Sequence, residues 1–197
     1  MNKTFKINNQ NIQISTFAKT GTTFMESLCG EYSDISRDTY TNPDKHYISV
    51  RYPLDRFISG FCTLYYRSHQ NNKTPEYQDL YTRISKMSLH DAFYECYYSQ
   101  KNNWDFDGHT IKSYSFIPED HTNITFINFR DIGILLSQLG YNPININDVY
   151  FNDNPNKDKQ YIHNIIHSDK DLYNDIQNYL GQDLGIYQKL PIFNFNA

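Results

Sequence analysis

The stretch QISTFAKTGTTFMESLC, residues 13–29, passes from a strand pattern through a short polar junction into a helix pattern. Apolar and polar residues alternate up to Phe17, which is typical of a half-buried strand. From Thr22 onward the apolar residues recur at helical spacing, and Gly30 is a suitable stop for the helix. The junction, Lys19–Thr23, contains a lysine, a glycine and three threonines. The stretch therefore predicts a strand–turn–helix unit of an α/β fold.

Further strand and helix patterns surround this unit. Upstream, residues 4–7 and 11–16 predict a hairpin around NNQN, or one strand after a short turn. Downstream, residues 46–53 predict a strand that ends at Pro53, followed by an amphipathic helix with Arg56 and Ser59 on its polar faces. The other predicted elements are a short strand over residues 32–36, one or two helices over 79–100, a buried strand over 124–129, a helix over 130–141 that ends at Gly140, and a final helix over 168–187 with Ser168 as its N-cap.

Strands that are separated by helices favour a layered α/β fold with a mainly parallel sheet. No internal repeat or linker interrupts the chain, so a single domain over residues 1–197 is expected. No apolar run approaches the length of a membrane-spanning helix, and the first residues lack the apolar segment of a signal peptide. The net charge of −4 disfavours nucleic acid or an anionic membrane as a partner. Cys29, Cys62 and Cys96 have no metal-ligand spacing, which predicts reduced thiols and a cytoplasmic location.

The first junction, Lys19–Thr23, has the chemistry of an anion site. A helix N-terminus presents unpaired N–H groups and the positive end of the helix dipole. Gly21 lets the backbone approach a ligand, and the threonines and Lys19 add donors and charge. The order differs from a Walker A loop, because the lysine precedes the glycine. An ordinary strand–turn–helix with a threonine cap explains the same residues equally well.

A second junction, VRYPLDRFISGF over residues 50–61, follows the next strand. Ligands of open α/β sheets bind outside the carboxyl ends of the strands, where Arg51 is expected. An arginine and a hydroxyl, here Arg51 and Ser59, suit a phosphate. Together the two junctions predict a ligand with two separated phosphates.

The two junctions resemble the cofactor motifs of the sulfotransferases that use 3′-phosphoadenosine 5′-phosphosulfate (PAPS), and the carbohydrate sulfotransferases among them most closely. The family's P-K-T-G-[ST]-[ST] motif corresponds to AKTGTT, with Ala18 in place of the proline. Its R-[DN]-P-x-x-R-x-x-S motif corresponds to RYPLDRFIS, with Tyr52 in place of the acid or amide. Residues 124–141 and 171–188 are similar to the family's late strand–helix and C-terminal helix. The resemblance implies a P-loop-NTPase-like three-layer fold with a mainly parallel central sheet flanked by helices.

The resemblance also implies roles for individual residues. Lys19 would contact the bridging oxygen and neutralise charge on the leaving phosphate, as a catalytic residue. Thr20, Gly21, Thr22 and Thr23 would cradle the 5′-phosphate. Arg51 and Ser59 would bind the 3′-phosphate. Arg56 would either support that site or pair with Asp55 or another surface carboxylate.

The general base that the acceptor hydroxyl requires is expected at His109, in a stretch faintly similar to the family's H-x-x-P-Q region. His46 begins its strand and so should lie at the wrong end of the sheet. Lys157 lies in NPNKDK, which is expected to be a solvated loop, with closure over the cofactor as the alternative. The other candidates for the base are Glu31, Asp34, Asp38, His121, His163 and His167.

The expected function is therefore the transfer of a sulfonate group from PAPS to a hydroxyl acceptor, a glycan or a small metabolite, with 3′,5′-bisphosphoadenosine (PAP) as product and no metal. A nucleoside-phosphate kinase of related fold is one alternative, and it would require Mg²⁺ and ATP. A non-catalytic nucleotide-binding or interaction module is the other.

Overall fold

In the computed structural model, residues 3–17, 19–38, 42–70, 78–102, 117, 122–142 and 155–193 are described. The chain divides into two compact units, and each has a hydrophobic core of its own. The sheet unit comprises Met1–Arg51, Phe116–Phe151 and Ile186–Ala197, and the helical unit comprises Tyr52–Ser115 and Asn152–Gly185. The single domain expected over residues 1–197 stays a prediction.

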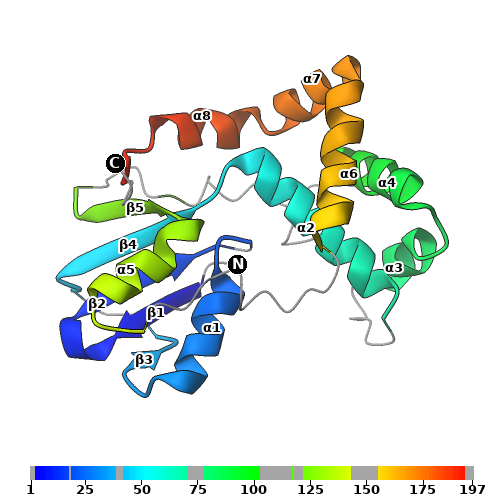
Figure 1. Ribbon diagram of the computed structural model, residues 1–197. Helices are drawn as coiled ribbons and strands as arrows, with labels where there is room; N and C mark the ends of the chain where they lie inside the picture. The colour runs from blue at the N-terminus through cyan, green and yellow to red at the C-terminus, as the bar shows by residue number, and fades with distance from the viewer. Residues whose placement is uncertain are drawn as a thin grey trace. The chain divides into compact units, whose positions relative to one another are not determined.

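A six-stranded sheet in the order β3-β1-β2-β4-β5-β6 forms the centre of the sheet unit (Figure 1). Strands β2, β4, β5 and β6 pair in parallel, whereas β1 is antiparallel to both β2 and β3. This confirms the α/β class and the mainly parallel sheet, while the P-loop-like three-layer fold stays a prediction. The strands are β1 (Lys3–Ile7), β2 (Ile12–Thr16), β3 (Ile35–Ser36), β4 (Lys45–Val50), β5 (Ile124–Asn128) and β6 (Ile192–Phe193).

The predicted hairpin forms from β1 and β2, which are joined by the 3₁₀ turn η1 (Asn8–Gln10). Asn11 closes the turn with a left-handed φ of 49°, a conformation that asparagine tolerates better than most residues. Helices α1 (Thr22–Glu31) and α5 (Ile132–Gln138) lie on one face of the sheet (Figure 1). Their apolar side chains share one core with those of the strands, and this core fixes α1 and α5 beside the sheet.

The helical unit contains α2 (Pro53–Ser68), α3 (Gln78–Ile84), α4 (Leu89–Asn102), α6 (Pro155–Ser168), α7 (Lys170–Tyr179) and the first part of α8 (Gly181–Lys189). Pro53 at the start of α2 has a φ that suits the first helical turn. Aromatic rings on α2 and α4 form the centre of the core. Phe61 meets Phe93 edge-on at 5.2 Å between ring centroids, and Phe57 meets Tyr97 at 6.2 Å. Such ring pairs stabilise the contact between the two helices by more than the burial of their apolar area alone provides.

Several boundaries in the second half of the chain differ from the prediction. The final helix is divided into α7 and α8, and the break falls before Gly181, the residue type least suited to a helix interior after proline. Asp169, not Ser168, caps α7: its carboxylate accepts bonds from the N–H groups of Asp171 and Leu172, both at 3.0 Å. Ser168 instead donates to the Ile165 carbonyl and ends α6.

The segment NPNKDK is not a loop over its described part, because α6 begins at Pro155. Proline is favoured in the first helical turn, where its missing N–H is not needed. Lys157 therefore lies in the first turn of a helix. The helix α6 and the strand β6 were both missed by the sequence prediction.

Arg56 is wholly buried, which corrects its placement on a polar face of α2. Its Nη2 lies 3.7 Å from Oδ2 of Asp183, and both side chains are 0% exposed. Asp183 lies in the first turn of α8, where the positive end of the helix dipole favours a carboxylate. Asp55, the other partner considered for Arg56, pairs with His163 at 3.3 Å. Arg56 is thus part of the core of the helical unit.

The environment of His46 predicts that the stability of the protein depends on pH. Its Nε2 lies 2.9 Å from Ser15 Oγ, and burial lowers the pKa of the imidazole below its ordinary value. The native state therefore resists protonation, and the unfolded chain takes up the proton first as the pH falls. The contribution of neutral His46 to the free energy of unfolding is therefore complete above about pH 6.5, the ordinary pKa of histidine. It is lost progressively as the pH falls below that value.

We expect the free energy of unfolding to decrease between pH 7 and pH 5, and to decrease less in His46→Gln. Urea unfolding at each pH measures this. His90→Gln is the control, because His90 is exposed on α4. Equal pH slopes for wild type and His46→Gln would contradict the prediction.

In the described part of the chain, no helix is long and apolar enough to cross a membrane.

Candidate functional site

The carboxyl ends of β2, β4 and β5 meet at one edge of the sheet unit, which we call the carboxyl edge. The register pairs Ser15 with Ile48 and Val50 with Asn128, so the three strands end side by side. The loop that contains Lys19 follows β2, and Arg51 follows β4 directly. His46 pairs with Gln13 and Ile124 at the other end of these strands, as expected.

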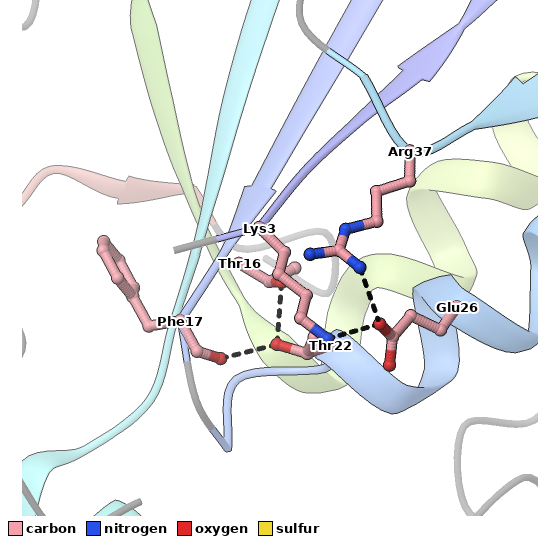
Figure 2. Close-up of polar contacts among 6 residues, drawn as sticks. All are labelled: Lys3, Thr16, Phe17, Thr22, Glu26 and Arg37. Carbon is pink, nitrogen blue, oxygen red and sulfur yellow. Dashed lines mark hydrogen bonds and ion pairs between the residues drawn. The ribbon is translucent and has the colours of Figure 1, made fainter. Parts of the chain in front are cut away.

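Side-chain hydroxyls hold the loop after β2 in place. Thr20 Oγ1 accepts a bond from the Phe17 N–H at 2.7 Å and donates to the Phe17 carbonyl at 3.0 Å. Thr22 Oγ1 donates to the same carbonyl at 2.8 Å and lies 2.8 Å from Thr16 Oγ1, as Figure 2 shows. From β4, Ser49 Oγ donates to the Thr20 carbonyl at 2.6 Å. The hydroxyls of Thr20 and Thr22 therefore shape the loop, which leaves Thr23, exposed on α1, as the threonine hydroxyl of the junction that faces solvent.

The backbone of the loop turns through two left-handed residues. Lys19 has φ 67° and Gly21 has φ 98°. A left-handed lysine costs about 1 kcal/mol or more, and such strain is concentrated at functional sites. The first intrahelical bond of α1 runs from the Met25 N–H to the Gly21 carbonyl at 3.0 Å. The N–H groups of Thr22, Thr23 and Phe24 therefore face out of the helix N-terminus, as an anion requires.

Gly21 cannot be replaced without strain, for two separate reasons. Its φ is unfavourable for any residue with a Cβ, and an added Cβ would lie 2.6 Å from Ile132 Cδ1. We expect Gly21→Ala to lower the free energy of unfolding by about 2 to 3 kcal/mol, measured by urea unfolding.

Gly140→Ala is the matched control, because Gly140 has φ 89° but no atom within 4 Å of an added Cβ. The difference between the two alanine variants measures the contact with Ile132 alone. Ile132→Val removes the contacting methyl group. In the Gly21→Ala background it should therefore recover the part of the stability loss that this contact causes. Equal losses for Gly21→Ala and Gly140→Ala would show that the contact is not limiting.

Arg51 is held against an aromatic ring at the carboxyl edge. Its side chain is 9% exposed, and its Cζ lies 4.6 Å from the centroid of the Phe129 ring. Phe129 follows β5 and begins the short 3₁₀ helix η4 (Phe129–Asp131). A guanidinium over an aromatic face keeps its full charge and a fixed plane, which suits a phosphate. The carboxyl edge thus brings Lys19, Arg51 and the N-terminus of α1 together within the sheet unit.

Two charged residues at this edge were missed by the sequence analysis. Arg130 is exposed and its Cζ lies 5.7 Å from the same Phe129 ring. Asp131 precedes α5 without capping it, and burial raises the pKa of its carboxyl above the ordinary value. Both directly follow the buried strand β5, so the rule that placed Arg51 at a carboxyl end could have found them as well.

Glu26 lies one turn along α1 from Thr22 and binds two cations. Its Oε1 pairs with Lys3 Nζ and lies 4.0 Å from Arg37 Nη1, as Figure 2 shows. Lys3 is opposite Thr16 in the β1–β2 register, so this cluster is also near the end of β2. All three side chains are partly exposed, and exposed pairs of this kind contribute about 1 kcal/mol or less to stability.

Ser59, predicted to bind the 3′-phosphate with Arg51, belongs to the helical unit. It lies in α2, is 4% exposed, and its carbonyl accepts a bond from Thr63 Oγ1 at 3.1 Å. Its predicted role stays a prediction. The same holds for the other predicted site residues, Lys19, Thr20, Gly21, Thr22, Thr23, Arg51 and His109.

The candidate bases lie in different parts of the fold. Glu31 ends α1, about 14 Å along the helix from Thr22. Asp34 accepts bonds from Asn9 at 2.9 Å and Tyr141 at 2.5 Å, beside the hairpin turn, and Asp38 pairs with Lys6 at 2.7 Å. His163 and His167 stack on each other in the helical unit, at 5.9 Å between ring centroids. His109, His121 and Ala18 lie outside the described residues.

Among the described residues, no group of three or more histidine, cysteine, aspartate or glutamate side chains is arranged to hold a metal ion.

Comparison of the chain with protein-family models, with curated proteins and with solved structures found no match.

Proposed function

We propose that the chain is a sulfotransferase that transfers a sulfonate group from PAPS to a hydroxyl acceptor, a glycan or a small metabolite. The observation that supports this most is the carboxyl edge of the sheet unit. There the loop with the left-handed Lys19 leads into the N-terminus of α1, and Arg51 lies over the Phe129 ring. These groups are donors and cations of the kind that phosphates require.

Each group has a role in this proposal. The N–H groups of Thr22, Thr23 and Phe24, with the Thr23 hydroxyl, bind the 5′-phosphate. Lys19 stabilises the negative charge that the phosphate oxygen gains when its bond to sulfur breaks and the acceptor oxygen bonds to sulfur. Arg51 binds the 3′-phosphate. The acceptor loses its proton to a base, for which His109 stays the proposed residue.

A thermal-shift titration with PAP tests the proposal, with AMP and ATP–Mg²⁺ as controls. A ligand that binds only the native state stabilises it by about 2.7 kcal/mol at one hundred times its Kd. Stabilisation by PAP but not by AMP is expected, because AMP lacks the 3′-phosphate. Stabilisation by ATP–Mg²⁺ alone would refute the proposal and favour a kinase.

Removal of the Arg51 guanidinium should weaken PAP binding specifically. We expect Arg51→Ala to raise the Kd for PAP by about tenfold to a hundredfold, because a hydrogen-bonded charge pair contributes about 1.5 to 3 kcal/mol. Calorimetric titration with PAP measures the change.

Arg51→Lys keeps the charge but loses the planar guanidinium, so it should recover only part of the affinity. Wild-type affinity for PAP in Arg51→Ala would remove Arg51 from the site.

A further inference from the structure

One aromatic ring at the carboxyl edge carries two guanidinium groups. Phe129 is 7% exposed, and its ring centroid lies 4.6 Å from Arg51 Cζ and 5.7 Å from Arg130 Cζ. The two arginines come from different strand ends, Arg51 from β4 and Arg130 from the turn after β5. The fold therefore brings together two cations that are far apart in the sequence.

The position of Arg130 is set by its backbone. Asn128 caps η4, and its Oδ1 accepts a bond from the Arg130 N–H at 3.1 Å. Val50 and Asn128 are register partners, so this cap lies next to the residue that precedes Arg51. Packing of Phe129 into the core shared by the sheet, α1 and α5 fixes the ring itself. The support for both arginines is thus part of the structured core.

The two guanidinium groups favour an anion at this edge, and the adjacent Asp131 carboxyl, whose pKa burial raises, offsets part of their charge when it is ionised. A ring contact stabilises a guanidinium without cancelling its charge. Two guanidiniums beside the same ring repel each other, and a ring contact uses the face of a guanidinium rather than the in-plane N–H groups that phosphate and sulfate oxygens bind. An anion that contacts both arginines gains from each of them and relieves their repulsion.

We propose that Arg130 is a further anion-binding residue of the carboxyl edge and that Phe129 is the positioning residue that holds Arg51 and Arg130 toward one ligand with two phosphate groups. The inference deepens the proposed function and rests on it for the identity of that ligand as a bisphosphorylated nucleotide. The anion site itself does not depend on sulfonate transfer.

The test compares Arg130→Gln with Lys45→Gln. Lys45 is an exposed cation of the same unit but begins β4, at the opposite end of the strand from Arg51. Both variants remove one positive charge and one exposed side chain, so they change the net charge of the protein equally and differ in where the charge is lost. Calorimetric titration with inorganic pyrophosphate and with PAP gives the affinities.

We expect Arg130→Gln to weaken the binding of both probes about tenfold, and Lys45→Gln to change it less than twofold. Phe129→Leu should weaken binding too, and by less when Arg130→Gln is already present, because both changes then affect the same contact. Should Phe129→Leu fail to fold, the exposed Arg130 variant still decides the question.

The outcomes separate this inference from the proposed function. Equal affinities of Arg130→Gln and Lys45→Gln for both probes would overturn the role of Arg130 and leave the sulfotransferase proposal standing. Pyrophosphate binding that depends on Arg130, without any PAP binding, would support the anion site and overturn the sulfotransferase. Absence of binding by either probe to the wild-type chain would overturn both.

Discussion

Arg56→Ala is expected to lower the free energy of unfolding by about 3 to 5 kcal/mol, the range for breaking a buried ion pair. The Asp183 carboxylate is 0% exposed and lies 3.7 Å from the Arg56 guanidinium. Without Arg56 it would be a buried charge without its cation, in a core from which water is excluded. A loss of this size is a large part of the total stability of a typical domain. Urea unfolding measures it.

Arg83→Ala is the matched control for this prediction. Arg83 is also in the helical unit, and its Nη1 lies 2.9 Å from Glu95 Oε1, closer than in the buried pair. Its side chain is 53% exposed, however, so the expected loss is about 1 kcal/mol or less. The comparison tests whether burial, rather than distance, decides the effect.

Replacement of both Arg56 and Asp183 separates the contribution of charge to stability from that of packing. In Arg56→Met with Asp183→Leu neither residue is charged, and apolar side chains fill a similar volume. Such replacements are often neutral or stabilising, so we expect the double variant to recover most of the loss. A loss below about 1 kcal/mol in Arg56→Ala would contradict the prediction, because it would mean that Asp183 is hydrated or takes up a proton at little cost.

The sequence predicted the strand–turn–helix at Lys19–Thr23 and the β4–α2 junction correctly because their signals are local. Alternation up to Phe17, a glycine at the turn and a proline at the start of α2 each act over a few residues. The placement of Arg51 at a carboxyl end followed from the same local patterns and from one rule of α/β sheets.

The errors arose where tertiary contacts decide the outcome. Arg56 has the polarity of a surface residue, and only the fold brings Asp183, 127 positions away, to pair with it in the core. The hydroxyls of Thr20 and Thr22 both bond to the Phe17 carbonyl in the folded loop, which the sequence did not predict, and their role in binding a phosphate stays a prediction. The carboxyl-end rule could have found Arg130, but the position of Arg51 over the same Phe129 ring becomes apparent only once β4 and β5 pair.

Lys19→Ala is expected to reduce sulfonate transfer by about a hundredfold to a thousandfold, the effect of removing one group that stabilises transition-state charge. The affinity for PAP should change much less, because in the proposed function the phosphates are also bound by the backbone N–H groups of α1 and by Arg51. Turnover of PAPS with an acceptor found by screening measures the first quantity, and calorimetric titration with PAP the second.

Lys19→Gly distinguishes the chemical role of Lys19 from a structural one. The φ of 67° is unfavourable for lysine and accessible to glycine, so the variant removes strain in the native loop while it adds entropy to the unfolded chain. We expect its free energy of unfolding to lie within about 1 kcal/mol of wild type, although its transfer rate falls as far as that of Lys19→Ala. A stable loop without activity would mean that the strained lysine is needed for its charge and not for the stability of the loop. Wild-type turnover in both variants would instead show that Lys19 stabilises no charge during transfer.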